Sequence, residues 1–402
     1  MTCRSPRPAD LRAPILPTRP DTTPALFTTA RPAASPVIPR RGILKAGVAG
    51  LMLAGLPAPA EARTPQPAGP ATRVALMSCI HQARPAPALD LVVGYDPDIA
   101  IFAGDNVYGD VSGPEMTELA AAYALAATRP AFTTLRRDRL VMPIWDDHDR
   151  GIDDGGGDFP HSTAAKALFQ AFWALPADDP RRGRAGLYHA VITGPVGRRV
   201  QVILLDCRSF RSPLALAAGG LAPGGGRYVP SGPEQAMLGA DQWAWLADQF
   251  RQPAELRLVV SSIQVIADGH GWESWRLMAD ERARLWRLIR DTGARGVVLL
   301  SGDRHLGALY RTEPGSDNSD ASRIDTGSLP PYPVTELTAS SVNLPNLAIT
   351  DEPGPNRLGR VWPMENWGRI DIDWWQGTVT LAVVDDGGIT RRQAVLRIAE
   401  LA

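Results

Sequence analysis

Short apolar runs alternate with amphipathic segments from Thr72 to about residue 300, and this alternation predicts an α/β fold. The apolar runs are almost continuous, which is typical of strands that are buried on both faces of a sheet. The expected strands are Arg73–Met77, Ile99–Ala103, Leu140–Ile144, Val200–Leu205, Leu256–Ser261 and Val297–Leu300. The expected helices are Pro114–Arg137, Ser162–Leu175, Gly239–Phe250 and Asp280–Thr292, and Gly293 stands where a helix C-cap is expected.

Beyond residue 335 the pattern predicts strands alone. These are Val334–Ala339, Arg369–Trp375, Thr378–Val384 and Gln393–Ile398. The Gly/Pro-rich segments Ala217–Ser231 and Glu313–Pro333 are expected to be loops. We therefore expect residues 72–402 to form a single α/β domain in which a second sheet shares the core, with a linker over residues 63–71.

The first 62 residues have a different pattern. Residues 1–39 are rich in Pro, Ala, Thr and Arg, and paired Arg40 and Arg41 precede the apolar stretch Ala46–Leu56. With the small residues that end at Ala62, this predicts a twin-arginine export signal cleaved near Ala62, after an N-terminal extension. Either that extension is genuine or translation starts later, for instance near Val37. The expected partner during export is the twin-arginine translocase, and the expected location is the periplasm or the exterior.

Composition excludes several classes of protein. The 402 residues are 44% hydrophobic and carry a formal net charge of −1, so we expect no stable nucleic-acid or membrane partner held by charge. Only three cysteines are present, which excludes a disulfide framework. No apolar run reaches the roughly 20 residues that a membrane-spanning helix needs.

Polar clusters follow five of the expected strands directly. They are Ser78-Cys79, Gly104–Tyr108, Trp145–Asp149, Asp206–Arg208 and Ser301–His305. Sites in α/β sheets form beyond the carboxyl ends of strands, so we expect these clusters to meet at one place. Carboxylates, imidazole, phenol and thiol gathered there would repel one another without cations between them, which predicts a site for several metal ions.

The ligand types indicate which ions the site would hold. Aspartate oxygens suit hard cations such as Ca²⁺, Mg²⁺ or Mn²⁺, whereas a thiolate beside a phenolate suits trivalent iron. Metal ions a few ångströms apart typically clamp a phosphate and activate water.

The ordered motifs resemble those of the PhoD-like alkaline phosphatase family, within the calcineurin-like metallophosphoesterases. The matching series is Ser78-Cys79, Gly104-Asp105-x-x-Tyr108, Trp145-Asp146-Asp147-His148-Asp149, Asp206-x-Arg208 and Ser301-Gly302-Asp303-x-His305. Further matches are Ser261–Val265, His270–Glu273, Glu336–Thr338 and Asn366–Ile370, so that the resemblance covers roughly residues 73 to 385.

The resemblance implies an αββα sandwich of two mixed β-sheets flanked by helices, with Fe³⁺ and one or two Ca²⁺ ions at the sheet edge, other divalent metals being possible. The implied metal ligands are Cys79, Asp105, Tyr108, Asp147, Asp303 and His305, with Cys79 and Tyr108 on the iron and Asp105 as the bridge. His148 would stabilise or protonate the leaving group.

Several of these residues have alternative interpretations. Cys79 is either a thiolate ligand or the partner of Cys207 in a disulfide, since both follow strands and an exported protein can pair them. Arg208 and Arg211 match phosphate oxygens well, and we expect them to bind substrate, with Arg208 also serving catalysis; the alternative for Arg208 is a salt bridge with Asp206.

Two further residues are candidates for substrate binding. Gln264 stands at a strand end, where it could orient a metal ion or water, and His270 is either a phosphate ligand or an ordinary loop residue.

The sequence therefore predicts an exported metal-dependent phosphoesterase of the alkaline phosphatase or phosphodiesterase type, hydrolysing phosphomonoesters, phosphodiesters or both with a metal-activated hydroxide. One departure bears on this prediction. Where relatives often continue Tyr-Gly-x-Asn-Asp, this chain has Arg150-Gly151-Ile152-Asp153-Asp154. A catalytically weak metal- and phosphate-binding protein on the same fold is the alternative that this departure leaves open.

Overall fold

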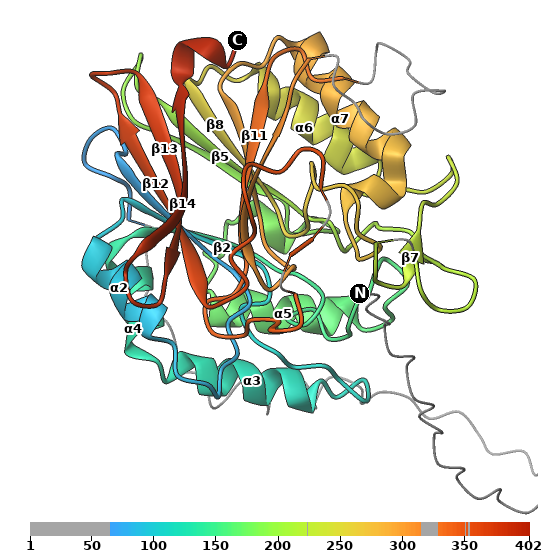
Figure 1. Ribbon diagram of the computed structural model, residues 1–402. Coiled ribbons are helices and arrows are strands. Elements are labelled where there is room, and N and C mark those ends of the chain that lie inside the picture. The colour runs from blue at the N-terminus through green and yellow to red at the C-terminus, as the bar shows by residue number, and fades with distance from the viewer. Residues whose placement is uncertain (1–64, 223, 315–328, 350, 353) are drawn as a thin grey trace, which may run out of the picture. The chain divides into compact units, whose positions relative to one another are not determined.

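Two six-stranded mixed sheets pack against each other, and helices flank them on their outer sides (Figure 1). The computed structural model describes residues 65–222, 224–314, 329–349, 351–352 and 354–402, all of them within the compact unit Val48–Ala402. The expected export signal over residues 1–62 and most of the expected loop Glu313–Pro333 lie outside the described residues. No helix among the described residues is long and apolar enough to cross a membrane.

The first sheet combines three parallel strands with an antiparallel extension. Its order is β14 (Thr390–Arg397), β13 (Thr378–Asp385), β12 (Asn366–Asp373), β1 (Arg73–Met77), β2 (Ile99–Ala103) and β3 (Leu140–Ile144). Strands β1, β2 and β3 are parallel, and β12 pairs antiparallel with β1.

The second sheet has a parallel centre and an antiparallel strand at each edge. Its order is β10 (Gly307–Thr312), β11 (Val334–Ala339), β9 (Val297–Ser301), β8 (Leu256–Ser261), β5 (Val200–Leu205) and β4 (His189–Thr193). Strands β11, β9, β8 and β5 are parallel, whereas β10 and β4 are antiparallel to their neighbours. The expected sandwich of two mixed sheets is confirmed.

Helices cover the outer side of each sheet (Figure 1). The helices α2 (Pro87–Tyr95), α3 (Thr117–Ala127), α4 (Pro130–Asp138) and α5 (Ser162–Phe172) lie on the side of β2. The helices α6 (Ala240–Arg251) and α7 (Ala279–Thr292) lie beside β5 and β8. Three short 3-10 helices, Pro180–Arg182, Trp275–Met278 and Ile398–Glu400, and a two-stranded ribbon of β6 (Ala215–Leu216) and β7 (Tyr228–Val229) complete the described elements.

The core lies between the two sheets and under the helices. Strands β1, β2, β5, β8 and β9 are buried along almost their whole length, which explains their continuous apolar sequence. The sheets approach closely at Gly368 of β12, where an added Cβ would lie 3.0 Å from Leu337 of β11 and 3.0 Å from Leu76 of β1. A side chain at position 368 would therefore require its neighbours in the core to shift.

Several expected elements differ from the structure. The expected helix Pro114–Arg137 is two helices, because Pro130 cannot donate a backbone hydrogen bond and holds Arg129 in an extended conformation. Strands β4 and β10 and helix α2 were not expected from the sequence, and part of the expected loop Ala217–Ser231 forms β7. Gly293 ends α7 in a left-handed conformation, as expected.

Candidate metal centre

Four predicted ligands from three different strand ends meet in one cluster. Cys79 follows β1, Asp105 and Tyr108 follow β2, and His305 follows β9. The Tyr108 hydroxyl donates to Asp105 Oδ2 at 3.1 Å and lies 3.2 Å from His305 Nε2, and Cys79 Sγ lies 3.6 Å from Asp105 Oδ2. A thiol, a phenol, an imidazole and a carboxylate therefore face one another, a donor set that suits a transition metal.

The backbone at these positions is unusual. Cys79, Asp105, Asp303 and His305 all have positive φ angles, of 56°, 50°, 66° and 55°. Residues other than glycine adopt this region at a cost, and such strain concentrates at functional sites. At the end of β2, Gly104 precedes Asp105 with φ +94°, and an added Cβ would lie 2.5 Å from the Cβ of Asp146. The glycine lets the ends of β2 and β3 come together.

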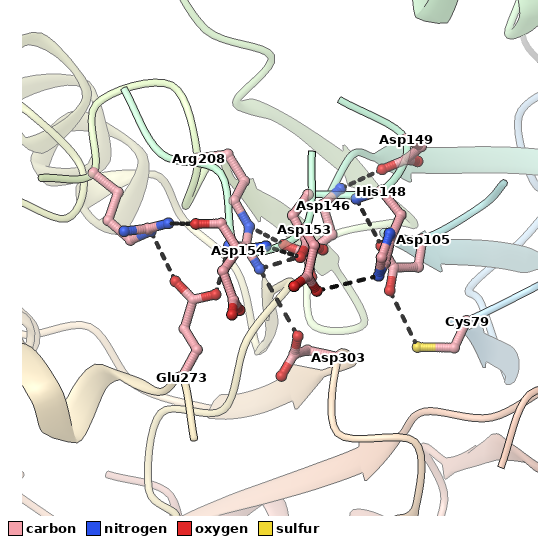
Figure 2. A network of polar contacts seen from close by, with 12 residues as sticks. Cys79, Asp105, Asp146, His148, Asp149, Asp153, Asp154, Arg208, Glu273 and Asp303 are labelled. Atoms are coloured by element: carbon pink, nitrogen blue, oxygen red, sulfur yellow. Dashed lines mark hydrogen bonds and ion pairs between the residues drawn. The ribbon is translucent and has the colours of Figure 1, made fainter. Parts of the chain in front are cut away.

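Two carboxylate-rich clusters adjoin the first one. Ligand atoms of Asp105, Asp147 and His148 lie within 4.8 Å of one another, as do those of Asp146, Asp147 and Asp303. Asp105 thus belongs to the cluster of Cys79 and His305 as well as to that of Asp147. This shared position fits the bridging role that the motif implies for Asp105. Figure 2 shows Asp105 between Cys79 and His148, and Asp146 beside Arg208.

Burial makes this group of side chains costly to charge without cations. It raises the pKa of Asp105 and of Asp303 well above the usual value, with neighbouring carboxylates adding to the shift. Burial likewise raises the pKa of the Cys79 thiol to about 11 and lowers that of His305. A bound cation would reverse these shifts and keep the carboxylates and the thiol ionised.

The hydrogen bonds of these side chains also leave atoms that could bind a cation. Asp146 Oδ2 and Asp147 Oδ1 are buried and have no hydrogen-bond partner among the described residues. His305 Nδ1 bonds to the Leu344 carbonyl oxygen, which places the ring proton on Nδ1 and leaves Nε2 free to bind a metal. Leaving buried carboxylate oxygens without a partner is costly, and coordination of a metal ion is one way to satisfy them.

His148 has a fixed orientation at the edge of the clusters. Its Nδ1 lies 2.8 Å from Asp110 Oδ1, and its Nε2 lies 3.8 Å from Asp153 Oδ1. Burial alone would lower the pKa of His148, but the carboxylates of Asp105, Asp110 and Asp147 outweigh it and raise the pKa to about 11. These carboxylates favour the protonated ring, which can donate a hydrogen bond.

Arg208 forms salt bridges with other acidic residues than Asp206, the alternative partner that the sequence suggested. Its guanidinium pairs with Asp146 and with Glu273 and is fully buried. The expected alternative partner Asp206 instead accepts backbone N–H bonds from Leu187, Arg208 and Ser209, so the predicted salt bridge is wrong. Arg208 Nη2 has no hydrogen-bond partner among the described residues and lies 3.6 Å from Asp147 and 3.8 Å from Asp303.

The other predicted substrate ligands lie further from the metal clusters. Arg211 Nε lies 2.7 Å from Glu273 Oε1, so that Glu273 joins the two arginines. Gln264 is fully buried and donates to Tyr310 and Thr338, and His270 Nε2 lies 3.1 Å from Gln264 Oε1. This buried pair does not line the cavity over the metal clusters.

A cavity of about 200 Å³ opens over the predicted ligands. Its lining includes Asp105, Asp147, His148, Asp303 and His305, and also Asp153, Asp154, Arg227, Trp272, Glu273, Arg304 and Asn346. The sequence analysis did not single out Arg227, Arg304 or Asn346. Arg304 is the unspecified position of the Ser301–His305 motif. Arg227 and Asn346 stand in loops without a local motif, so only a search for arginines near the glycine-rich segment would have suggested Arg227. Asp110 was also not predicted, although it lies only two residues after Tyr108 and could have been found from its position next to that motif.

The alternative of a disulfide between Cys79 and Cys207 is wrong for this structure. Both cysteines are buried free thiols. Cys79 Sγ lies 3.1 Å from the Ser340 hydroxyl, and Cys207 Sγ lies 3.3 Å from the Ser261 hydroxyl. Cys207 is a small buried residue beneath the site, and only Cys79 reaches the metal clusters.

Comparison with known proteins agrees with this geometry. A family model described as PhoD-like phosphatase matches residues 74–361. A solved structure described as "Structure of PhoD" is similar with a TM-score of 0.61 at 16% identity, over 83% of this chain and 70% of that chain. GAP50, described as the anchor in the inner membrane complex of Plasmodium, is similar with a TM-score of 0.50 at 12% identity, over 82% and 89% of the two chains. No curated protein matches the sequence. At such identities the structural matches show the fold alone.

Proposed function

Because the chain belongs to the PhoD-like phosphatase family, we propose that it is a metal-dependent hydrolase of phosphate esters. One observation carries the proposal: three clusters of ligand atoms are joined by Asp105 and Asp147, and each cluster contributes residues to the lining of one cavity. Two of their buried carboxylate oxygens lack hydrogen-bond partners among the described residues. This is the arrangement that several neighbouring cations need.

The proposed metals are Fe³⁺ and one or two Ca²⁺ ions. The thiol of Cys79 and the phenol of Tyr108, with His305 and Asp105, form a mixed set of sulfur, oxygen and nitrogen donors that supports iron, and the aspartate clusters support hard divalent cations. Such ions, when bound, would activate the attacking water and offset negative charge on the phosphate oxygens.

Side chains of the protein would stabilise and protonate the leaving group. His148 is held through Nδ1 by Asp110, so Nε2 is the nitrogen that presents a proton to the cavity. We assign it the role of general acid or hydrogen-bond donor to the departing alcohol. Arg208, which is fixed by Asp146 and Glu273, is fully buried and does not line the cavity, so its role would be to hold the carboxylates in place.

Export through the twin-arginine pathway to the periplasm or the exterior is part of the proposal. It rests on Arg40, Arg41, the apolar stretch Ala46–Leu56 and Ala62, which lie outside the described residues. Export of a folded protein would let the metal centre assemble before translocation.

The test is hydrolysis of bis-p-nitrophenyl phosphate and p-nitrophenyl phosphate at alkaline pH by protein purified after native export. The protein is assayed as isolated, after chelation and after calcium is restored. Loss of activity on chelation and its return with calcium support a metal phosphoesterase. A folded, metal-loaded protein that binds phosphate and turns over neither ester would contradict the proposal in favour of a binding protein.

A further inference from the structure

A second cavity, of about 350 Å³, adjoins the catalytic one. Asp153 and Asp154 line both cavities. The rest of the second lining is largely apolar and comprises Ile152, Phe159, Pro160, Pro213, Leu214 and Leu216, with Asp158, Arg211 and Tyr228. The two cavities therefore share a wall but differ in chemistry.

The catalytic cavity offers little to an apolar group. Every residue that lines it is charged or polar except Trp272. Such a lining suits a phosphate, its metal ions and water, whereas the organic part of an ester would have no apolar surface to contact there. The second cavity supplies that surface directly beside it.

The side chain of Asp154 joins the two cavities. It accepts a hydrogen bond at 2.5 Å from the hydroxyl of Tyr228, which lines the second cavity, and it pairs with Arg227, which lines the catalytic cavity. Asp153 pairs with Arg227 at 2.8 Å and lies 3.8 Å from His148 Nε2. The nitrogen that would protonate the leaving alcohol thus points toward the shared wall.

We infer that the second cavity binds the apolar alcohol part of the substrate, while the phosphate lies in the catalytic cavity. The inference rests on the proposed function and names its substrate class: phosphate esters of alkyl or aryl alcohols. In the reaction, water adds its oxygen to phosphorus and the P–O bond to the alcohol breaks. The alcohol oxygen keeps the bonding electrons and takes a proton from His148. The attacking water loses one proton to the solvent, from which His148 is protonated again.

The rim of the second cavity supports this assignment. Ile152 and Leu216 are 45% and 68% exposed, so two aliphatic side chains stand in water at its mouth. An alkyl chain that enters the cavity would cover them, and each methylene removed from water favours binding. Longer alkyl groups should therefore be better substrates.

The experiment measures kcat/KM for ethyl, butyl and hexyl phosphates, as monoesters and as symmetric diesters, with the full-length metal-loaded protein. Symmetric diesters remove the question of which group departs. We expect the hexyl ester to exceed the ethyl ester by about tenfold or more. In Leu216→Asp the hexyl-to-ethyl ratio should fall at least threefold, because a charged side chain replaces apolar rim surface.

The matched control is Leu221→Asp. Leu221 is 72% exposed in the same glycine-rich segment but lines neither cavity, so the ratio should stay at the wild-type value. Both leucines are exposed, so folding should survive each change, which circular dichroism checks. A flat chain-length profile in the wild type, or an unchanged ratio in Leu216→Asp, would overturn the inference while leaving phosphoesterase activity intact. No turnover of any ester would instead contradict the proposed function, and the inference would fail with it.

Discussion

His148 and Asp110 form a pair in which Nδ1 of the imidazole lies 2.8 Å from Oδ1 of the carboxylate. The two residues are 38 positions apart and follow different strands, β3 and β2. The carboxylate fixes which ring nitrogen faces the cavity, as carboxylates that orient catalytic histidines commonly do. Asp110 is therefore a positioning residue for the proposed proton donor.

Replacing Asp110 tests this pairing. We expect Asp110→Asn to lower kcat by about tenfold or more, within the range that acid–base assistance contributes, with little change in KM. The pH–rate profile should shift as well, because the variant removes a carboxylate that raises the pKa of His148. The control is Asp248→Asn, which changes an exposed aspartate paired with Arg251 on α6. An unchanged kcat and pH profile in Asp110→Asn would remove the pair from the mechanism.

Replacing the imidazole itself should have the larger effect. His148→Ala should reduce turnover by about a hundredfold or more, since it removes the proton donor to the leaving group. Metal content, measured by elemental analysis, should stay close to that of the wild type, because the clusters around Cys79 and Asp303 do not need His148. Turnover at the wild-type rate would exclude His148 as the acid.

The two buried cysteines offer a matched pair for the iron assignment. Cys79→Ser should lose bound iron and its visible charge-transfer colour, because Cys79 belongs to the cluster with Asp105 and His305. Cys207→Ser changes an equally buried thiol that contacts Ser261 outside that cluster, and it should keep the colour. The measurement is an absorption spectrum with iron content. Full colour in Cys79→Ser would show that the thiol is no ligand.

Glu273 should be important for stability as well as for the site. It is buried and joins Arg208 and Arg211, so Glu273→Gln removes the anion that pairs with buried Arg211 and leaves Arg208 with Asp146 as its close partner. Breaking a buried ion pair typically costs about 3–5 kcal/mol of unfolding free energy. Glu255→Gln breaks the partly exposed pair with Arg199 and should cost about 1 kcal/mol or less. Urea denaturation of both variants measures the difference, and equal losses would contradict the assigned role.

The burial of His189 in β4 predicts that the free energy of unfolding decreases at acidic pH. Burial, helped by the nearby Arg181, lowers the pKa of His189 from 6.5 to about 4. Below about pH 6.5 the unfolded chain binds a proton that the folded chain does not, so stability falls as the pH falls from 6.5 toward 4. His189→Gln should remove this pH dependence, which amounts to a loss of unfolding free energy on the order of 3 kcal/mol between pH 6.5 and pH 4. Denaturation curves with the same slope for wild type and variant would contradict the prediction.

Much of the fold could be read from local pattern. The expected bounds of β1, β2, β3, β5 and β8 agree with the structure, because strands buried on both faces are mainly apolar. The edge strand β4 is short and partly exposed, and it was not predicted. The split between α3 and α4 was readable at Pro130, and the prediction overlooked it.

The sequence by itself determined which side chains stand at which strand end, and parallel strands bring their carboxyl ends to one edge. That is why Cys79, Asp105, Asp147 and His305 could be placed together before the structure was known. Only the tertiary structure decided the partners of the charged groups. Arg208 pairs with Asp146 and Glu273, which are 62 and 65 positions away, and Arg227 meets Asp153 across 74 positions. Such pairs depend on how loops pack over the sheets, and no local periodicity encodes that packing.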